Sequence, residues 1–417
     1  MFGKGALIYV IGFSIIFSIY QLKLNQLTVR ASDNFVSHYM GTIVHEEAMT
    51  ATNIGISRVW ETSTNNDTFT IVSPPCTSFV AISAIGSDTV LVRTKTRSRI
   101  FDDDYYSLHN TTLELRDSVL AYFAYQTPVS QFFWFTGTEN GVYWITGDTV
   151  WGPVHSNHIL HTNGSPVFYG KVTAKTGISP NPAAPGNNAH FYGGWEVGVD
   201  ASVPTDMTHL IMAAVAGNGG APVNTVSLYN QTLTLNFLSN GNVIRTVGTS
   251  PPDTVALADI APTGAIHSVR DIHVYGVLNG QVTLHTTRNI WIDNDITYNT
   301  NPLTDPNCTS FLGLVADQNV VIADNQANNN NVVIHANILA ATGSMTAQNY
   351  AGRPVAGTLT IVGSIAQASR GAIGTFGGGG GITHGFSKRY YFDPRCQTIS
   401  PPNYPFVRLL RLVSWWE

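Results

Sequence analysis

Residues 5–22 have the sequence Gly-Ala-Leu-Ile-Tyr-Val-Ile-Gly-Phe-Ser-Ile-Ile-Phe-Ser-Ile-Tyr-Gln-Leu, a stretch without a charged side chain. Lys4 and Lys23 lie directly on either side of it. As an α-helix it would rise about 27 Å, close to the ~30 Å thickness of a bilayer's hydrocarbon core. The stretch therefore predicts a membrane-spanning helix. Lys4 favours a cytoplasmic N-terminus, which places the rest of the chain outside the membrane.

The alternative is a secretory signal peptide that is removed from the mature protein. The apolar region of such a peptide normally has about 7–15 residues and precedes a cleavage site of small residues. Here the apolar run ends in Tyr-Gln-Leu-Lys-Leu at residues 20–24, which contains no such site. We therefore expect the helix to remain attached.

The helical pattern continues beyond the apolar stretch. No proline occurs before Pro74, and apolar residues recur at steps of three to five, which places them on one helical face. We expect one helix from about residue 5 to about residue 60, roughly 80 Å long. A filament subunit needs such a rod, because its outer half packs on its own head and its inner half on neighbouring subunits. The apolar stripe comprises Leu24, Leu27, Ala31, Phe35, Tyr39, Ile43, Ala48, Ala51 and Ile54.

Residues 3–11, Gly-Lys-Gly-Ala-Leu-Ile-Tyr-Val-Ile, precede a helical pattern that contains His-Glu-Glu-Ala-Met-Thr-Ala at residues 45–51. These about 60 residues resemble the N-terminus of bacterial type IV pilin-like proteins, nearest to the minor pilins. The resemblance implies that a prepilin peptidase cuts after a glycine. The cut would follow Gly5 and leave Ala6 first, or follow Gly3 and leave Lys4 first.

One position departs from the pilin pattern. Major pilins carry a glutamate five residues after the cut, and this glutamate pairs with the N-terminus of the next subunit. Here that position holds Val10 after a cut at Gly5, or Ile8 after a cut at Gly3. Assembly by the usual charge pairing is therefore not expected.

Composition limits the remaining possibilities. Charged residues form 11% of the 417 residues, against about a quarter in a typical domain. The 21 Lys and Arg and 26 Asp and Glu residues give a net charge of −5, which offers no basic surface for nucleic acid. Aromatic residues form 11% of the chain, ample material for a buried core. Few charges among many Gly, Asn, Thr and Ser residues fit an extracytoplasmic β protein.

The three cysteines form no disulfide framework. A bridge between Cys308 and Cys396 is one alternative in an exported chain, and three unpaired thiols, with Cys76, are the other.

The fold class expected is α+β and mainly β. Residues 1–60 form the helix, and residues 61–131 alternate like the half-buried strands of an antiparallel, pilin-like head. Within this region the acidic run Asp102-Asp103-Asp104 is interpreted as a solvated turn rather than a calcium site.

From residue 132 to about residue 384, short Val- and Ile-rich strands end in Gly or Asn at intervals of about ten residues. This pattern of short strands predicts an irregular parallel β-solenoid, interrupted at about residues 178–262. A β-sandwich is the alternative. The interruption is expected to hold a short helix within Ala201–Ala216 and a hairpin turning at Asn240-Gly241. Residues 385–417, with Trp415 and Trp416, are expected to cap the last rung after a flexible joint at Gly377–Gly381.

The chain from residue 152 onward carries a second resemblance. Residues 152–157 and 164–170 and the tail at 385–395 and 401–405 are similar to an uncharacterised family of bacterial surface proteins. In that family a pilin-like N-terminus precedes a β-solenoid. The resemblance implies an architecture rather than an activity.

Carboxylates on the flank of a solenoid could cleave polysaccharides. Asp293 and Asp295 are two apart on one predicted strand and therefore share a face, about 6.6 Å apart at Cα. An inverting hydrolase needs two carboxyl groups about 6.5–9.5 Å apart. Asp317 and Asp324 are further candidates. The sequence Asp-Asn-Asp is equally a turn, and no Arg or Lys cluster lies nearby, so we expect no enzyme.

His155, His158 and His161 recur at steps of three, but their surroundings favour strands and turns, in which the three rings do not converge. No nucleotide-binding loop or nucleophile elbow is present in the sequence. We expect no metal and no cofactor.

The sequence therefore predicts a structural subunit of a surface filament or pilus-like assembly, inserted first in the inner membrane and then displayed outside the cell. Its partners would be the membrane and copies of itself or other pilin-like subunits. The alternative is a tethered β-solenoid that binds or cleaves carbohydrate, with exposed aromatics at Tyr192 and Trp195 as glycan contacts. The apolar side chains expected in the membrane or filament core are Leu7, Ile8, Val10, Ile11, Phe13, Ile15, Ile16, Phe17 and Ile19.

Overall fold

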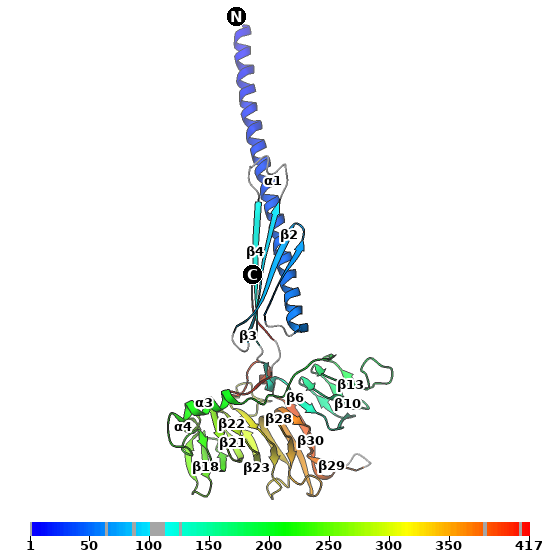
Figure 1. Ribbon diagram of the computed structural model, residues 1–417, viewed down its shortest axis with the longest axis vertical. Coiled ribbons are helices and arrows are strands. Elements are labelled where there is room, and N and C mark those ends of the chain that lie inside the picture. The colour runs from blue at the N-terminus through cyan, green and yellow to red at the C-terminus, as the bar shows by residue number, and fades with distance from the viewer. Residues whose placement is uncertain are drawn as a thin grey trace. The chain divides into compact units, whose positions relative to one another are not determined.

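A computed structural model describes residues 2–62, 66–85, 89–100, 113–124, 127–377, 382–407 and 411–417 (Figure 1). The chain divides into two compact units. We call Met1–Tyr125 with Leu410–Glu417 the N-terminal unit, and Gln126–Leu409 the β unit. The acidic run at 102–104 and residues 378–381 of the predicted joint lie outside the described residues.

The N-terminal unit contains the predicted long helix without interruption. Helix α1 (Phe2–Thr62) has 61 residues, so it is about 90 Å long. From residue 5 to residue 39 most of its side chains are exposed, whereas Met40, Val44, Ala48 and Ala51 are buried at steps of three or four. The helix is long and apolar enough to cross a membrane, a property that signal sequences share. Only the C-terminal third of α1 is therefore tied to the rest of its unit.

That part of α1 packs on a five-stranded antiparallel sheet in the order β1-β2-β3-β4-β32. Figure 1 shows α1 continuing well beyond the sheet. At the contact, a Cβ on Gly55 would lie 2.8 Å from Val80, and Thr52 donates a hydrogen bond to Thr94. The strands are β1 (Asp67–Ser73), β2 (Cys76–Ile85), β3 (Thr89–Ile100), β4 (Leu113–Ala124) and β32 (Arg411–Trp416).

The last strand changes the expected role of the C-terminal tail. Strand β32 pairs antiparallel with β4, with Trp415 opposite Ala121 and Trp416 opposite Leu120. The tail expected to cap the β unit is thus divided, and its two tryptophans belong to the N-terminal unit. The physical reason is that β4 would otherwise expose an unpaired edge, which β32 covers.

The β unit begins with short strands and the 3-10 helix η1. They are β5 (Thr127–Pro128), η1 (Val129–Gln131), β6 (Trp134–Thr138), β7 (Tyr143–Ile145), β8 (Thr149–Val150), β9 (Val154–Ser156), β10 (Ile159–Asn163), β11 (Val167–Phe168), β12 (Val172–Ala174), β13 (Gly177–Ser179), β14 (His190–Phe191) and β15 (Trp195–Val197). Strand β10 pairs in parallel with β7 and β13, β11 with β8 and β14, and β12 with β9 and β15. This stack runs through Val197, so it extends into the predicted interruption.

The second half of the β unit follows helix α3. Its elements are α3 (Thr208–Asn218), β16 (Leu228–Tyr229), β17 (Leu233–Phe237), β18 (Asn242–Val247), β19 (Asp253–Ala256), α4 (Leu257–Ile260), β20 (Ala265–Ser268), β21 (Ile272–Leu278), β22 (Gln281–Thr286), β23 (Ile290–Tyr298), β24 (Phe311–Ala316), β25 (Val320–Ile322), β26 (Val332–Ala340), β27 (Met345–Ala347), β28 (Val355–Ser369), β29 (Gly374–Phe376), β30 (Ile382–Phe392), η2 (Pro394–Gln397) and β31 (Phe406–Val407). Strands β17 and β18 form the predicted hairpin, with Gly241 at φ 86° in its turn.

Most of the later strands also pair in parallel, while β17–β18–β19 and β29–β30 are antiparallel, so the large sheet is mixed. Strand β6 lies between β28 and β9: Trp134 is in register with Ile365 on one side and with Val154 on the other. The first and last stacks of the β unit therefore share one continuous sheet.

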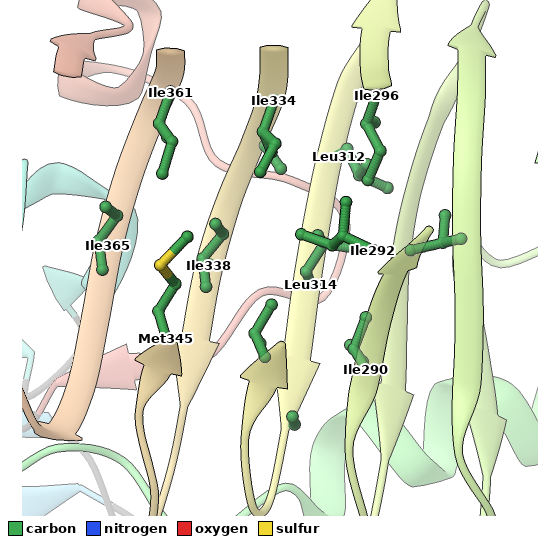
Figure 2. Packing of buried hydrophobic residues seen from close by; sticks show 14 of the residues in the cluster. Ile290, Ile292, Ile296, Leu312, Leu314, Ile334, Ile338, Met345, Ile361 and Ile365 are labelled. Atoms are coloured by element: carbon green, nitrogen blue, oxygen red, sulfur yellow. The ribbon is translucent and has the colours of Figure 1, made fainter. Parts of the chain in front are cut away.

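The core lies between the inward faces of these strands. Isoleucine and leucine side chains alternate along each strand and stack on equivalents in the next strand (Figure 2). The opposite face of β20, β24, β26 and β28 is covered by α3 and by the segment that contains Tyr404. Burial on both faces explains apolar runs such as Phe311–Ala316. The three cysteines are buried free thiols.

Candidate functional site

The apolar half of α1 is the most exposed hydrophobic surface among the described residues. Its nine predicted side chains are 51–74% exposed. The cleavage candidates Gly3 and Gly5 lie in the helix, where a Cβ would meet nothing within 4 Å. So large an apolar surface marks a contact with lipid or with other polypeptide. The nine side chains are those of Leu7, Ile8, Val10, Ile11, Phe13, Ile15, Ile16, Phe17 and Ile19.

The predicted glycan contacts Tyr192 and Trp195 occupy different environments. Tyr192 is 68% exposed and stacks on Tyr169, with ring centroids 5.3 Å apart. Tyr169 in turn stacks on Trp151, at 4.2 Å and an interplanar angle of 9°. Trp195 is 40% exposed and is in register with Val172 of β12. Both side chains are therefore exposed, and Tyr192 belongs to an aromatic stack.

A glycine follows each ring of this aromatic stack. The segments are Val-Trp-Gly at residues 150–152, Phe-Tyr-Gly at 168–170 and Phe-Tyr-Gly at 191–193. A Cβ on Gly193 would lie 2.6 Å from the Gly170 oxygen, and one on Gly170 would overlap the Gly152 carbonyl. The glycines thus let three backbone turns approach closely enough for the rings to stack. This aromatic-glycine repeat is the sequence signal that would have identified Trp151 and Tyr169.

A cleft of about 390 Å³ opens beside Trp151, between β8 and β30. In its lining, Lys388 Nζ lies 2.9 Å from Asp148 Oδ1 and 5.4 Å from the centre of the Trp144 ring. Burial lowers the pKa of Lys388, and Asp148 opposes that shift. The cleft is lined by Phe133, Trp144, Gly147, Asp148, Thr149, Val150, Trp151, Lys388, Arg389, Tyr390 and Tyr391.

A second, more open groove of about 760 Å³ lies over β17, β21 and β23. Trp291 stacks on His273 at 6.0 Å, and its indole nitrogen donates to Asp271. His273 Nδ1 lies 2.8 Å from Asp293 Oδ2. The groove is lined by Thr234, Asp271, His273, Tyr275, Trp291, Asp293, Asn294, Ala323, Asn325, Ala327 and Gln348.

The candidate pair Asp293 and Asp295 does not converge in this groove. Asp293 lines it, whereas Asp295 accepts a hydrogen bond from the backbone nitrogen of Val333 on β26. The register between β21 and β23 shifts between Val274 and Gly276, which leaves extra residues in β23. This bulge breaks the simple alternation on which the predicted pair depended.

The other two aspartates are held by partners of their own. Asp317 lies 3.1 Å from Nε2 of the buried His285, whose Nδ1 contacts Nδ1 of His267 at 2.9 Å. Burial lowers the pKa of His267 to about 4, and the neighbouring His285 adds to that effect. Asp324 accepts hydrogen bonds from Asn329 and Asn349. Neither aspartate lines the groove.

The three evenly spaced histidines each make separate contacts. His155 is buried between Thr173 and Asn157, and desolvation lowers its pKa. His161 packs beside Tyr143, while His158 hydrogen-bonds through its backbone nitrogen. Among the described residues, no group of three or more histidine, cysteine or acidic side chains could hold a metal ion.

Comparisons with protein-family models, with curated proteins and with solved structures gave no match for this chain. Three features of the chain are therefore candidates for a functional role: the exposed apolar half of α1, the aromatic stack with its adjoining cleft, and the Trp291 groove.

Proposed function

We propose that this protein is a membrane-inserted structural subunit that displays its β unit outside the cell and assembles through α1. The observation that supports the proposal is the contrast along α1. Its C-terminal part buries Val44, Ala48 and Ala51 against its own sheet, while the apolar part from Leu7 to Ile19 has no cover. Nine exposed large apolar side chains on one rod are stable only in lipid or against other helices.

The architecture favours assembly over simple anchoring. The exposed part of α1 extends beyond residue 22 to residue 39, so it is longer than a bilayer requires. An antiparallel sheet packed on the end of a long helix suits a pilin-like subunit, whose free helix contacts neighbouring subunits. Val10 or Ile8 at the pilin glutamate position means that such contacts would be apolar. For the β unit, we propose that the parallel stacks are rungs of a solenoid that projects from the assembly.

Removal of residues 2–30 tests this function. We expect the truncated protein to be recovered in the soluble fraction as a monomer, because the apolar surface is lost while the helix–sheet contact from Met40 onward is kept. Membrane flotation and sedimentation of the full and truncated chains measure this. A matched variant, Gly41→Ala, should leave both properties unchanged, since a Cβ there meets nothing within 4 Å. Truncated protein that still floats with membranes or polymerises would contradict the proposal.

Carbohydrate binding by the β unit is the second candidate function. It is favoured by the exposed stack of Trp151, Tyr169 and Tyr192, because aromatic rings present large, rigid surfaces that apolar faces of sugar rings can contact. A glycan array probed with the full chain in detergent should show binding that Trp151→Ala reduces. An array without signal, together with no release of reducing sugar, would leave only the structural role.

A further inference from the structure

The cleft beside Trp151 is a seam between two stacks of strands. Among the described residues, β8 is paired only with β11, and β30 only with β28 and β29. The sheet that joins the two stacks runs instead through β6, which pairs with β28 and with β9. The facing edges of β8 and β30 therefore leave room for a ligand, and backbone groups of both strands border it.

The aromatic stack ends at this cleft. In the aromatic stack, the ring of Tyr169 lies between the rings of Trp151 and Tyr192. Trp151 is covered on one side by Tyr169, and it lines the cleft, which Tyr169 does not. Tyr391 also lines the cleft. A ring-shaped ligand in the cleft would continue the stack on the uncovered side of Trp151.

The charges in the cleft favour an anion. Asp148 is neutralised by Lys388, whose ammonium group contacts both oxygens of that carboxylate. Arg389 lines the same cleft, is exposed, and makes no side-chain hydrogen bond or ion pair with another described residue. The lining thus carries one cation in excess, on a side chain whose five donors suit a carboxylate.

We propose that the cleft binds an acidic sugar residue of a polysaccharide, with the sugar ring against Trp151 and its carboxylate on Arg389. The inference rests on the second proposed function and specifies its ligand. An apolar ring face beside a carboxylate is the combination that a uronic acid offers. The rest of the polysaccharide chain would leave through the open side of the cleft.

Binding of hexagalacturonate to the full chain in detergent tests the inference, with the methyl ester of the same oligosaccharide as neutral counterpart. We expect calorimetry to show that the ester binds at least about tenfold more weakly than the acid. Arg389→Gln should weaken binding of the acid by about tenfold or more and remove the preference, and Trp151→Ala should weaken binding of both. Raising the salt concentration should weaken binding of the acid alone.

Two matched controls lie elsewhere on the β unit. Arg288→Gln removes an exposed arginine, and Tyr350→Ala removes an aromatic side chain that is 39% exposed. Both should leave binding unchanged, as should Trp291→Ala in the second groove. Equal binding of acid and ester, or wild-type binding by Arg389→Gln, would overturn the acidic ligand but keep carbohydrate binding. Binding lost in Trp291→Ala and kept in Trp151→Ala would overturn the location, and no binding of any glycan would overturn both proposals.

Discussion

Replacing Gly170 by alanine is expected to destabilise the β unit by about 3 kcal/mol or more, at the upper end for overpacked sites. The new Cβ would overlap the carbonyl group of Gly152 and lie 2.6 Å from the nitrogen of Pro153. These are backbone atoms of the neighbouring turn, so no side-chain rotation can make room. Urea unfolding of the full chain in detergent, followed by tryptophan fluorescence, measures the change.

The matched control for Gly170→Ala is Gly352→Ala in the same unit. There the nearest atom to a new Cβ is the side-chain oxygen of Asn349 at 3.0 Å, which can move aside. We expect a change below about 1 kcal/mol, as for most surface substitutions. If Gly170→Ala proved as mild as the control, the close approach of the turns, and with it the tight stacking of Tyr169 on Trp151, would not be a requirement of the fold.

The helix and the strand-rich character were predictable because their signals are local. An uncharged stretch at 5–22 and the lack of proline before Pro74 are sufficient for one helix, and α1 confirms it. The Asn240-Gly241 turn likewise predicted the β17–β18 hairpin, because glycine adopts the positive φ that such a turn needs. In each case the residues that determine the structure are neighbours in the sequence.

Pairings between distant strands were not predictable in the same way. Strand β6 meets β28 about 230 residues later, and β32 returns to β4 from the end of the chain. A strand edge offers the same row of backbone groups to any partner, so alternation alone does not specify which strand will pair. Trp415 and Trp416 could therefore be assigned to a cap although they lie beside Ala121 and Leu120 in the N-terminal unit.

The candidate site was also predictable only where its signals are local. Exposure of Tyr192 followed from its Gly-rich surroundings, but its stacking partner Tyr169 lies 23 residues earlier in the sequence, and the next ring, Trp151, lies 41 residues earlier. Only the aromatic-glycine repeat connects these three positions. The pairing of Asp293 with Asp295 failed for another reason, because a bulge alters strand alternation without a distinctive residue to announce it.

The second large effect is expected at a buried ion pair next to the cleft. Arg370 Nη1 lies 2.8 Å from Glu139 Oε2, with side-chain exposures of 6% and 0%. The guanidinium group also lies 4.7 Å from the centre of the Trp144 ring and 5.0 Å from that of Trp134. Glu139 follows β6 and Arg370 follows β28, so the pair lies where these two paired strands end.

Arg370→Ala should destabilise the β unit by about 3–5 kcal/mol, because it leaves the Glu139 carboxylate buried without its cation. The double variant Glu139→Leu with Arg370→Met removes both charges and should recover most of that loss, since apolar replacements of buried pairs are often neutral. Urea unfolding of the two variants gives the comparison. If the free energy of unfolding of Arg370→Ala were within about 1 kcal/mol of the wild-type value, water would have to reach Glu139. The cleft, which Trp144 lines, would then extend past that ring to the ion pair.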